Sequence, residues 1–493
     1  MVPMLRPTLR PDVAPTVHDE VAAAGSELIG GPAGRRVRPG GGPWNPLRVV
    51  ALVTIGMFAL GMAQKLPCYD GGWFLGASEQ YIHACYSDIP HLYGARGFAD
   101  DRIPYFEQIP EPTEHFAHLE YPVLTGLFMQ LAAWLTPGGT TDPRPEQIYW
   151  LVNSGMLLVC AVVVAVCVAR THRHRPWDGL LVALAPALAL TATINWDLLA
   201  GALTCAALLM WSRSRPLAAG VLLGLATAAK FYPLLLLGPL LVLCWRAGRW
   251  RAFATAAAGA AGAWLTVNLP FMLRAWDGWS EFYTFSQERP VDFGSFWLVL
   301  VHRFDADLPP ARVNLLATLL MAAGCAALAV LALAAPRRPR LGQLAFLVVA
   351  LFILTNKVYS PQYVLWLVPL AALARPRWRD MLIWQACEVL YFLGVWMYLA
   401  YSTSHQGLPP GGYHLAILVH LLGTAYLGVQ VVRDVLRPER DPVRRDGSDD
   451  PAGGVLDRAP DAFALSRPAP VPAAPAATAV HWGTSSGDVS RET

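Results

Sequence analysis

INWDLLAGALTCAALLMWSRSRPLAAGVLLGLATAAKFYPLLLLGPLLVLCWRAGRWR, residues 194–251, contains three apolar runs separated by short polar breaks. The break after the first run and the one after the third are rich in arginine, whereas the break between the second and third runs carries a lysine, Lys230. Apolar runs that recur with such breaks are typical of helices that cross a membrane back and forth. The stretch therefore predicts an all-α polytopic membrane protein.

The rest of the chain extends this pattern. The protein has 493 residues, of which 55% are hydrophobic, and a mean hydropathy of +0.38, which excludes an ordinary soluble globule. Several runs are shorter than the usual transmembrane length, so we expect their helices to lie inside the bundle. We predict twelve transmembrane helices, near residues 47–65, 147–169, 178–194, 196–211, 216–229, 231–245, 252–270, 312–334, 341–355, 361–374, 381–401 and 412–432.

The two ends of the chain differ from its middle. Residues 1–46 and 438–493 are rich in Pro, Gly, Ala and Arg, and they contain few large apolar residues. Such segments bury too little surface to offset the entropy of folding, so we predict two disordered tails around a transmembrane domain at 47–437.

Arginine predicts the orientation of the helices. Five tight loops are basic, whereas residues 271–311 hold three Arg against six Asp or Glu. Because basic loops stay on the cytoplasmic side, both tails are expected in the cytoplasm of a plasma-membrane protein. The five basic loops are 170–177, 212–216, 245–251, 336–340 and 374–380.

The first external loop, residues 66–146, is the longest connection. It holds eleven Asp or Glu against three Arg, and both Cys68 and Cys85 lie in it. On the oxidising side of a membrane these cysteines form either a disulfide or two buried thiols, and both readings stay open. Residues 120–135 look like another span, but a crossing there would place the later arginine loops outside, so we predict an interfacial or re-entrant helix.

The layout of one span, a large acidic loop and many further spans resembles that of the GT-C glycosyltransferases. More narrowly, it is similar to the actinobacterial family 87 group of polyprenol-phosphate-mannose-dependent α-mannosyltransferases. The phrases that carry the resemblance are YSDIPHLYGARG (86–97), IPYFE (103–107), EYPVLTG (120–126), INWDLLAGAL (194–203) and AAKFYPLLLLGPLL (228–241).

The resemblance implies an integral-membrane hexosyltransferase. Its donor would be a lipid-linked sugar, with mannose on a polyprenyl phosphate as the first choice, and transfer would proceed with inversion at the external face. The acceptor would be a cell-envelope glycolipid or polysaccharide. No nucleic acid partner, cofactor or metal is expected, since the chain has neither metal-ligand spacing nor a nucleotide fingerprint.

Such a reaction needs a carboxylate that can take the proton of the acceptor hydroxyl. Asp88 is our candidate for this base, with a helix cap as the alternative. Glu120, followed by Tyr121, is a second acid that would position the acceptor, unless its charge merely favours a helix N-terminus. In the family the key acid follows the first span closely, whereas residues 66–85 intervene here. Asp70 therefore stays a rival, as do Asp100 and Asp101.

A departing phosphate needs a cation. Only three of the 38 basic residues are lysines, and two of them occur in similar phrases, AAKFYP and NKVYSP. We predict that Lys230 and Lys357 bind the donor phosphate, with snorkelling to ordinary anionic lipid as the alternative. The further substrate-binding candidates are Tyr232, Tyr359, Gln362, Asp197, Tyr121 and Arg96.

The competing class is a transporter or flippase. Twelve spans with both ends inside suit that class. A transporter should, however, show related halves and ionisable residues near the middle of the membrane, whereas the candidate residues here gather at one face.

Overall fold

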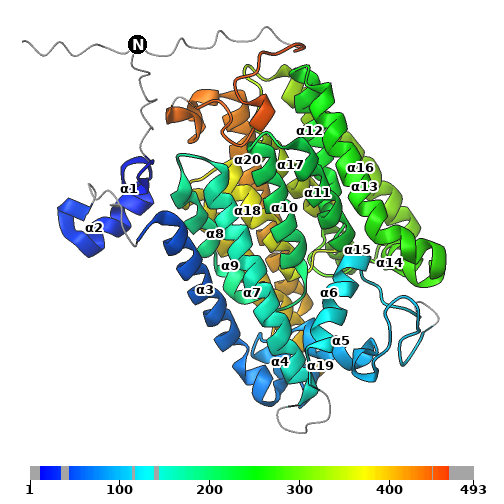
Figure 1. The fold of residues 1–493 in the computed structure, drawn as a ribbon. Helices are drawn as coiled ribbons and strands as arrows, with labels where there is room; N and C mark the ends of the chain where they lie inside the picture. Colours follow the sequence, from blue (N-terminus) through cyan, green and yellow to red (C-terminus); the bar gives the residue numbers. More distant parts are fainter. Residues whose placement is uncertain (1–11, 35–43, 114–116, 138–143, 447, 466–493) are drawn as a thin grey trace, which may run out of the picture.

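A computed structural model describes residues 12–34, 44–113, 117–137, 144–446 and 448–465. Every regular element in these ranges is helical, which confirms the predicted all-α class (Figure 1). Among them, six helices are long and apolar enough to cross a membrane. Those six are α3 (Pro46–Gln64, extending into the following turn), α7 (Pro145–Thr171), α13 (Trp250–Arg274), α16 (Pro310–Ala334), α19 (Trp378–Ser404) and α20 (Pro410–Leu436).

Shorter apolar helices complete the bundle. Those that follow α7 in the chain are α10 (Asp197–Ser212), α11 (Pro216–Ala229), α12 (Leu237–Arg246), α17 (Leu341–Thr355) and α18 (Val364–Ala374). All residues of α18 and most of α17 are buried, as expected for short helices inside a bundle. By contrast, only 6% of the most apolar 18-residue stretch of α16 is buried. The side chains of this helix therefore face lipid. The total of twelve crossings stays a prediction.

Proline and small residues explain much of the helix pattern. Proline begins α3, α7, α11, α16 and α20, where its missing N–H costs nothing and its fixed φ suits the first turn. Gly220 and Gly224 of α11 face α13 so closely that a Cβ at either position would lie 2.0 or 2.2 Å from the carbonyl oxygen of Ala256 or Ala260. This contact of small residues lets the two backbones pack directly together.

One predicted span is interrupted. Residues 178–194 do not form a single helix, because Pro186 starts a new helix and cannot continue the preceding one. The pieces in this part of the chain are η3 (Pro176–Gly179), α8 (Leu180–Ala183) and α9 (Pro186–Thr191).

Short elements cover one end of the bundle. Between α3 and α7 lie η1 (Cys68–Gly72), α4 (Ala77–Ile82), α5 (Asp88–Ala95), η2 (Phe98–Asp100) and α6 (Val123–Trp134). At 12 residues, α6 is about 18 Å long, too short to cross a bilayer. Cys68 and Cys85 form a disulfide with Cα atoms 5.7 Å apart, so the structure contains the first of the two alternatives. The same end also receives α14 (Trp276–Glu288), α15 (Phe296–Phe304), η4 (Tyr232–Leu236) and η5 (Pro361–Tyr363) (Figure 1).

The prediction of disordered tails is wrong for part of each tail. Residues 438–446 and 448–465 turn back onto the arginine loops at the other end of the bundle, where Asp441 accepts two hydrogen bonds from Arg340 at 2.7 and 3.0 Å. Asp461 pairs with both Arg246 and Arg338. The prediction of disorder rested on the small number of large apolar residues. Ion pairs and charge-assisted hydrogen bonds hold this segment in place instead. Its short helices are η6 (Pro438–Arg440), η7 (Arg444–Asp446) and η8 (Gly454–Leu456).

The N-terminal part also folds in part. Helices α1 (Pro15–His18) and α2 (Glu20–Gly34) precede the bundle, and Asp19 accepts a hydrogen bond from the backbone N–H of Trp378 at 3.0 Å. The other predicted tail residues, 1–11, 35–43 and 466–493, lie outside the described residues.

Candidate active site

Asp88 begins α5, but it does not cap that helix. Ser87 is the cap, because its hydroxyl oxygen accepts a hydrogen bond from the N–H of Ile89 at 3.3 Å. The same hydroxyl donates to the carbonyl of Thr193 at 2.6 Å, and the N–H of Asp88 donates to that of Ile194 at 2.8 Å. The backbone of Asp88 is therefore anchored to the turn before α10, while its carboxylate is free for another task.

Two side chains hold the Asp88 carboxylate. The hydroxyl of Tyr86 donates to one oxygen at 2.7 Å, and the amide of Asn195 donates to the other at 2.7 Å. Burial raises the pKa of Asp88, and the hydrogen bonds from Tyr86 and Asn195 together with the charge of Lys230 offset only part of this effect. The net pKa lies above that of an ordinary aspartate, which suits a residue that accepts a proton.

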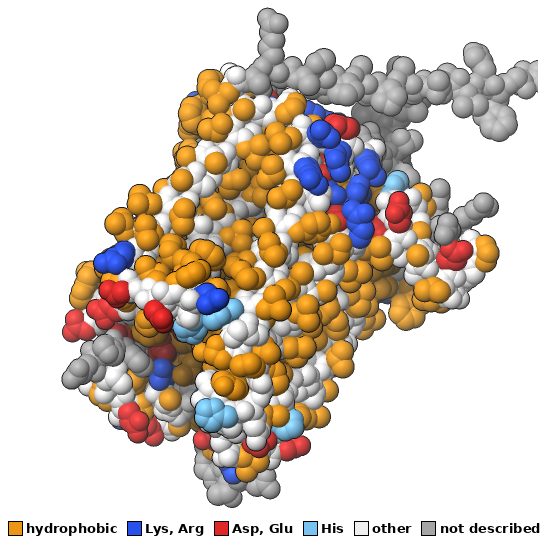
Figure 2. Space-filling model, turned by 180° about the vertical axis from the view of Figure 1, so that it is seen from behind, with side chains coloured by type: hydrophobic (Ala, Val, Ile, Leu, Met, Phe, Trp, Pro, Cys, Tyr) orange, Lys and Arg blue, Asp and Glu red, His pale blue; other side chains and the backbone are white. Residues whose placement is uncertain are grey.

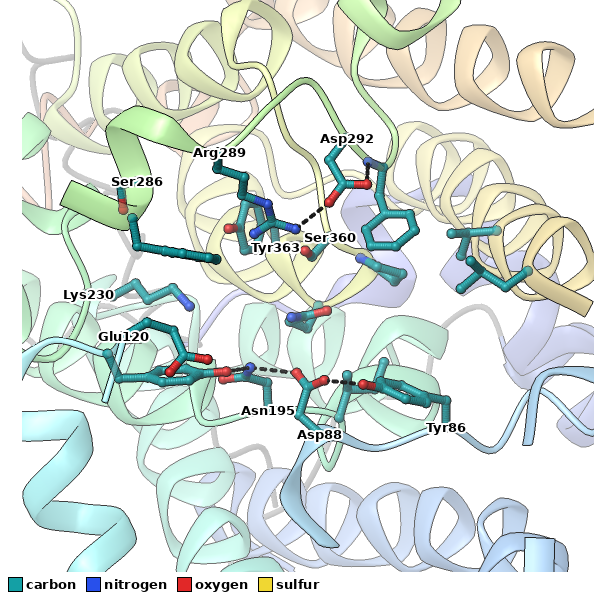
Figure 3. A pocket seen from close by; sticks show the side chains of 18 of the residues that line it. Tyr86, Asp88, Glu120, Asn195, Lys230, Ser286, Arg289, Asp292, Ser360 and Tyr363 are labelled. Atoms are coloured by element: carbon teal, nitrogen blue, oxygen red, sulfur yellow. Dashed lines mark hydrogen bonds and ion pairs between the residues drawn. The ribbon is translucent and has the colours of Figure 1, made fainter. Parts of the chain in front are cut away.

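This carboxylate faces a cavity of about 530 Å³. Figure 3 shows Asp88, Asn195 and Glu120 on one wall, with Arg289 and Asp292 on the opposite wall. The first wall comes from the start of α5 and from the segments just before α6 and α10. The second comes from the loop after α14 and the loop after α17, and α19 closes one end. Residues distant in the sequence thus meet at one polar site.

Glu120 lies in this cavity, whereas Arg96 lies behind it. The Arg96 guanidinium donates two hydrogen bonds to the Glu120 carboxylate, at 2.8 and 2.6 Å. Arg96 is not among the lining residues, and it orients Glu120; that it binds substrate stays a prediction. Tyr121 lines the cavity as predicted, and its hydroxyl accepts a hydrogen bond from Asn195 at 2.8 Å.

Lys230 follows α11 and faces the cavity from the side of Glu120 (Figure 3). Its ammonium nitrogen lies 3.3 Å from an oxygen of Asp197, which is 1% exposed and also accepts a hydrogen bond from the indole of Trp366 at 2.7 Å. Asp197 lines neither this cavity nor the one described next, and its contact with substrate stays a prediction. It holds Lys230 in place.

A second, more apolar cavity of about 830 Å³ adjoins the first. The two share Lys230, Arg289 and Tyr363, together with residues near the end of α14. The second cavity continues along α16, where Met321 lines it. Among the six long apolar helices, α16 is the least buried. The second cavity therefore runs from the polar site toward the lipid-facing surface.

Lys357 and Tyr232 line only the second cavity. The Lys357 ammonium donates to the carbonyl of Gln287 at 3.0 Å, and burial, with a smaller effect from Arg289, lowers its pKa to about 8. Lys357 and Lys230 thus border a common space, as the paired phrases suggested.

Gln362 and Tyr359, which lie close to Lys357 in the sequence, differ in whether they line a cavity. Gln362 lines the first cavity and is 6% exposed, and its side-chain oxygen has no hydrogen-bond partner among the described residues. Tyr359 lines neither cavity and donates instead to Glu388 at 2.7 Å, so its role in substrate binding stays a prediction.

Sequence reasoning missed several residues of the site. Tyr86 and Asn195 were not proposed, although Asn195 lies in the quoted phrase INWDLL. Arg289 was not among the predicted site residues, but it lines both cavities and pairs with Asp292 at 2.6 Å. Its position within the acidic stretch 271–311 was the available signal. Asp70 is exposed and lines neither cavity, which removes the geometric case for it as the base.

A broad apolar band separates a basic end from an acidic end of this all-helical bundle, as Figure 2 shows. At the site, the buried carboxylate of Asp88 faces a polar cavity that adjoins a more apolar one. This combination is the one expected of a membrane glycosyltransferase. Residues 119–355 match the model of glycosyltransferase family 87, which confirms the resemblance to that family and supports a membrane glycosyltransferase. The matched region includes Glu120, Asn195, Lys230 and Arg289 but not Asp88.

A crystal structure of an oligosaccharyltransferase from Archaeoglobus fulgidus, in the apo form, is a distant structural neighbour. The TM-score is 0.38 at 10% identity, and the alignment covers 79% of the present chain and 55% of the archaeal one. This likeness is too low to support any argument about the site. No curated protein matches the chain.

Proposed function

We propose that the protein transfers a sugar from a polyprenyl-phosphate donor to a hydroxyl group of a cell-envelope glycolipid or polysaccharide. The observation that carries the proposal is the pair of adjoining cavities, one more apolar than the other, with cationic side chains where they meet. The donor has matching parts: an apolar tail, a sugar and a phosphate between them. The tail would lie in the cavity beside α16, the phosphate near Lys230 and Arg289 at the boundary, and the sugar near Asp88. Mannose is the sugar favoured by the family resemblance.

In this proposal Asp88 removes the proton of the acceptor hydroxyl while the hydroxyl oxygen attacks the anomeric carbon. The bond from that carbon to the phosphate oxygen breaks, and the polyprenyl phosphate leaves with the electron pair. Lys230 and Arg289 stabilise the charge that develops on it. A single displacement of this kind inverts the anomeric centre.

The acceptor would enter at the end of the polar cavity that is distant from Lys230. There the rings of Tyr81, Tyr86 and Trp396 contact one another with centroids 5.1–5.9 Å apart, and Tyr81 stacks on Trp396. Electron-rich ring faces suit the C–H groups of a sugar, and the carboxylates nearby suit its hydroxyl groups. This composition supports a glycan acceptor.

The direct test uses purified protein in nanodiscs with a radiolabelled polyprenyl-phosphate sugar and an extract of envelope glycolipids. We expect a new labelled glycoside together with released polyprenyl phosphate, and neither product with Asp88→Asn. Movement of the intact donor lipid across proteoliposomes, without a new glycoside, would instead establish the transporter reading.

Transfer should weaken in acid. Because the base must be ionised and the pKa of Asp88 is raised, kcat/KM for the acceptor is expected to fall with decreasing pH earlier than for an ordinary aspartate. Tyr86→Phe removes a hydrogen bond that favours the charged form, so the acidic limb should move to higher pH. Asp70→Asn is the control that should leave the profile unchanged. An acidic limb that does not move in Tyr86→Phe would contradict the assignment of Asp88.

We further propose that the end containing Asp88 faces outside and that the arginine loops face the cytoplasm. The separation of basic and acidic side chains in Figure 2 supports this orientation. In intact cells, Ser214→Cys in an arginine loop should resist an impermeant thiol reagent, whereas Glu111→Cys should be labelled; both positions are exposed. The opposite pattern of labelling would invert the topology.

A further inference from the structure

Two ionisable side chains lie deep in the bundle and line neither cavity. Glu388 of α19 is 4% exposed and His420 of α20 is fully buried. A buried charge in a membrane protein is costly unless it is partnered, so such residues seldom persist without a task. The transfer mechanism proposed above does not use either residue.

Glu388 accepts three hydrogen bonds. Its Oε2 atom accepts from the hydroxyl of Tyr359 at 2.7 Å, and its Oε1 atom accepts from the indole of Trp384 at 3.0 Å and the hydroxyl of Thr424 at 3.2 Å. The same Oε1 lies 3.5 Å from Nδ1 of His420. Glu388 is thus the centre of a polar cluster that joins α19, α20 and the loop after α17.

His420 connects Glu388 to a backbone carbonyl of the neighbouring loop. Nε2 of His420 lies 3.1 Å from the carbonyl oxygen of Gly294, which can only accept, so Nε2 carries a hydrogen.

This pair reaches two loops of the active site. Gly294 belongs to the loop 289–295 and Tyr359 to the loop 356–361. The loops also bond directly to each other, since Tyr359 N–H donates to Phe293 and Asp292 N–H donates to Lys357, at 2.6 and 3.0 Å. Gly294 has φ +64°, and a Cβ there would lie 2.3 Å from the hydroxyl of Tyr391, so the approach requires glycine.

We propose that Glu388 and His420 are positioning residues that fix these two loops, and with them Arg289 and Lys357, in the arrangement that receives the donor phosphate. The inference rests on the proposed function for the identity of the ligand. The hydrogen bonds that connect the pair to Tyr359 and Gly294 do not depend on it.

The main test is Glu388→Gln, whose amide nitrogen cannot accept from Tyr359 or Trp384. We expect the KM for a polyprenyl-phosphate sugar to rise at least several-fold, with the acceptor KM unchanged. A merely structural role would lower the fraction of active enzyme, and hence kcat, without a change in KM. Trp384→Phe is the matched control: it removes a donor to the same Oε1 but its own hydrogen bonds reach neither loop. A donor KM of Glu388→Gln equal to that of wild type would overturn the proposal.

Tyr359→Phe provides a second variant should Glu388→Gln not fold. It keeps the ring that stacks on His420 at 4.2 Å and removes only the hydroxyl, so a smaller rise in donor KM is expected. An unchanged donor KM in this variant would also count against the role of the pair.

Hydrogen exchange separates this proposal from the proposed function. Amides of residues 289–295 and 356–361 should exchange faster in Glu388→Gln than in Trp384→Phe, whether or not the protein transfers a sugar. Equal exchange in the two variants would refute the positioning role even if sugar transfer were established. Faster exchange without any transfer by the wild type would uphold it and reject the proposed function.

Discussion

Asp88→Asn should lower kcat by about 100-fold or more while the protein stays folded and binds its lipid donor. Asparagine has nearly the shape of aspartate and can keep one hydrogen bond to Tyr86 or Asn195, but it cannot take a proton at neutral pH. The measurement is single-turnover transfer in nanodiscs at saturating donor. Near-normal transfer by this variant would exclude Asp88 as the base.

Asp70→Asn is the matched control for this experiment. Asp70 is exposed on η1 and faces neither cavity, so its replacement should leave kcat close to the wild-type value. An inactive Asp70→Asn beside an active Asp88→Asn would transfer the role of base to Asp70.

Lys230→Ala should lower kcat/KM for the lipid donor by about 10- to 100-fold. The loss corresponds to a charge-assisted contact worth about 1.5–3 kcal/mol. Acceptor KM should change little, because the ammonium lies at the boundary with the apolar cavity, away from the Tyr86 end of the site. Donor titrations at fixed acceptor concentration measure the effect.

The substitution has a second consequence, which must be separated from the first. Without Lys230, the buried carboxylate of Asp197 loses the cation 3.3 Å away, and stability should fall. In the double variant Lys230→Ala/Asp197→Asn the stability should recover, while the donor defect should remain. If the donor defect disappears in the double variant, Lys230 has no direct role toward the phosphate.

Arginine at position 230 distinguishes phosphate binding from snorkelling to ordinary lipid. A phosphate site shaped around a compact ammonium should be rescued only in part by the wider planar guanidinium. Full rescue by Lys230→Arg would favour snorkelling. Lys357→Ala should have a smaller effect, because the Lys357 ammonium is held by the Gln287 carbonyl and its lowered pKa leaves part of it uncharged near pH 8.

Helix positions were largely predictable from local signals. Residues 216–229 and 341–355 were predicted as spans, and α11 and α17 occupy these same ranges. Proline at a helix start and arginine in a tight loop act within a few residues, so a sequence reveals them directly. Pro186 is the exception, since an apolar run hid the interruption of the helix around it.

The site was predictable only in part. Asp88, Glu120 and Lys230 have a chemistry that marks them in the sequence, and all three line the cavity. Whether a polar residue faces a cavity or stands behind another residue depends on tertiary packing, which a sequence does not display. The sequence therefore did not reveal that Arg96 and Asp197 hold Glu120 and Lys230.

The ion pairs of residues 438–465 also determine when the molecule can be completed during synthesis. A ribosome adds about 5–20 residues per second from the N-terminus, so Arg246, Arg338 and Arg340 emerge well before Asp441 and Asp461. Until the last of these aspartates emerges, one end of the bundle has unpaired guanidinium groups. The nascent chain thus matures in a late step, and a stop codon just after α20 would leave it permanently in that early form.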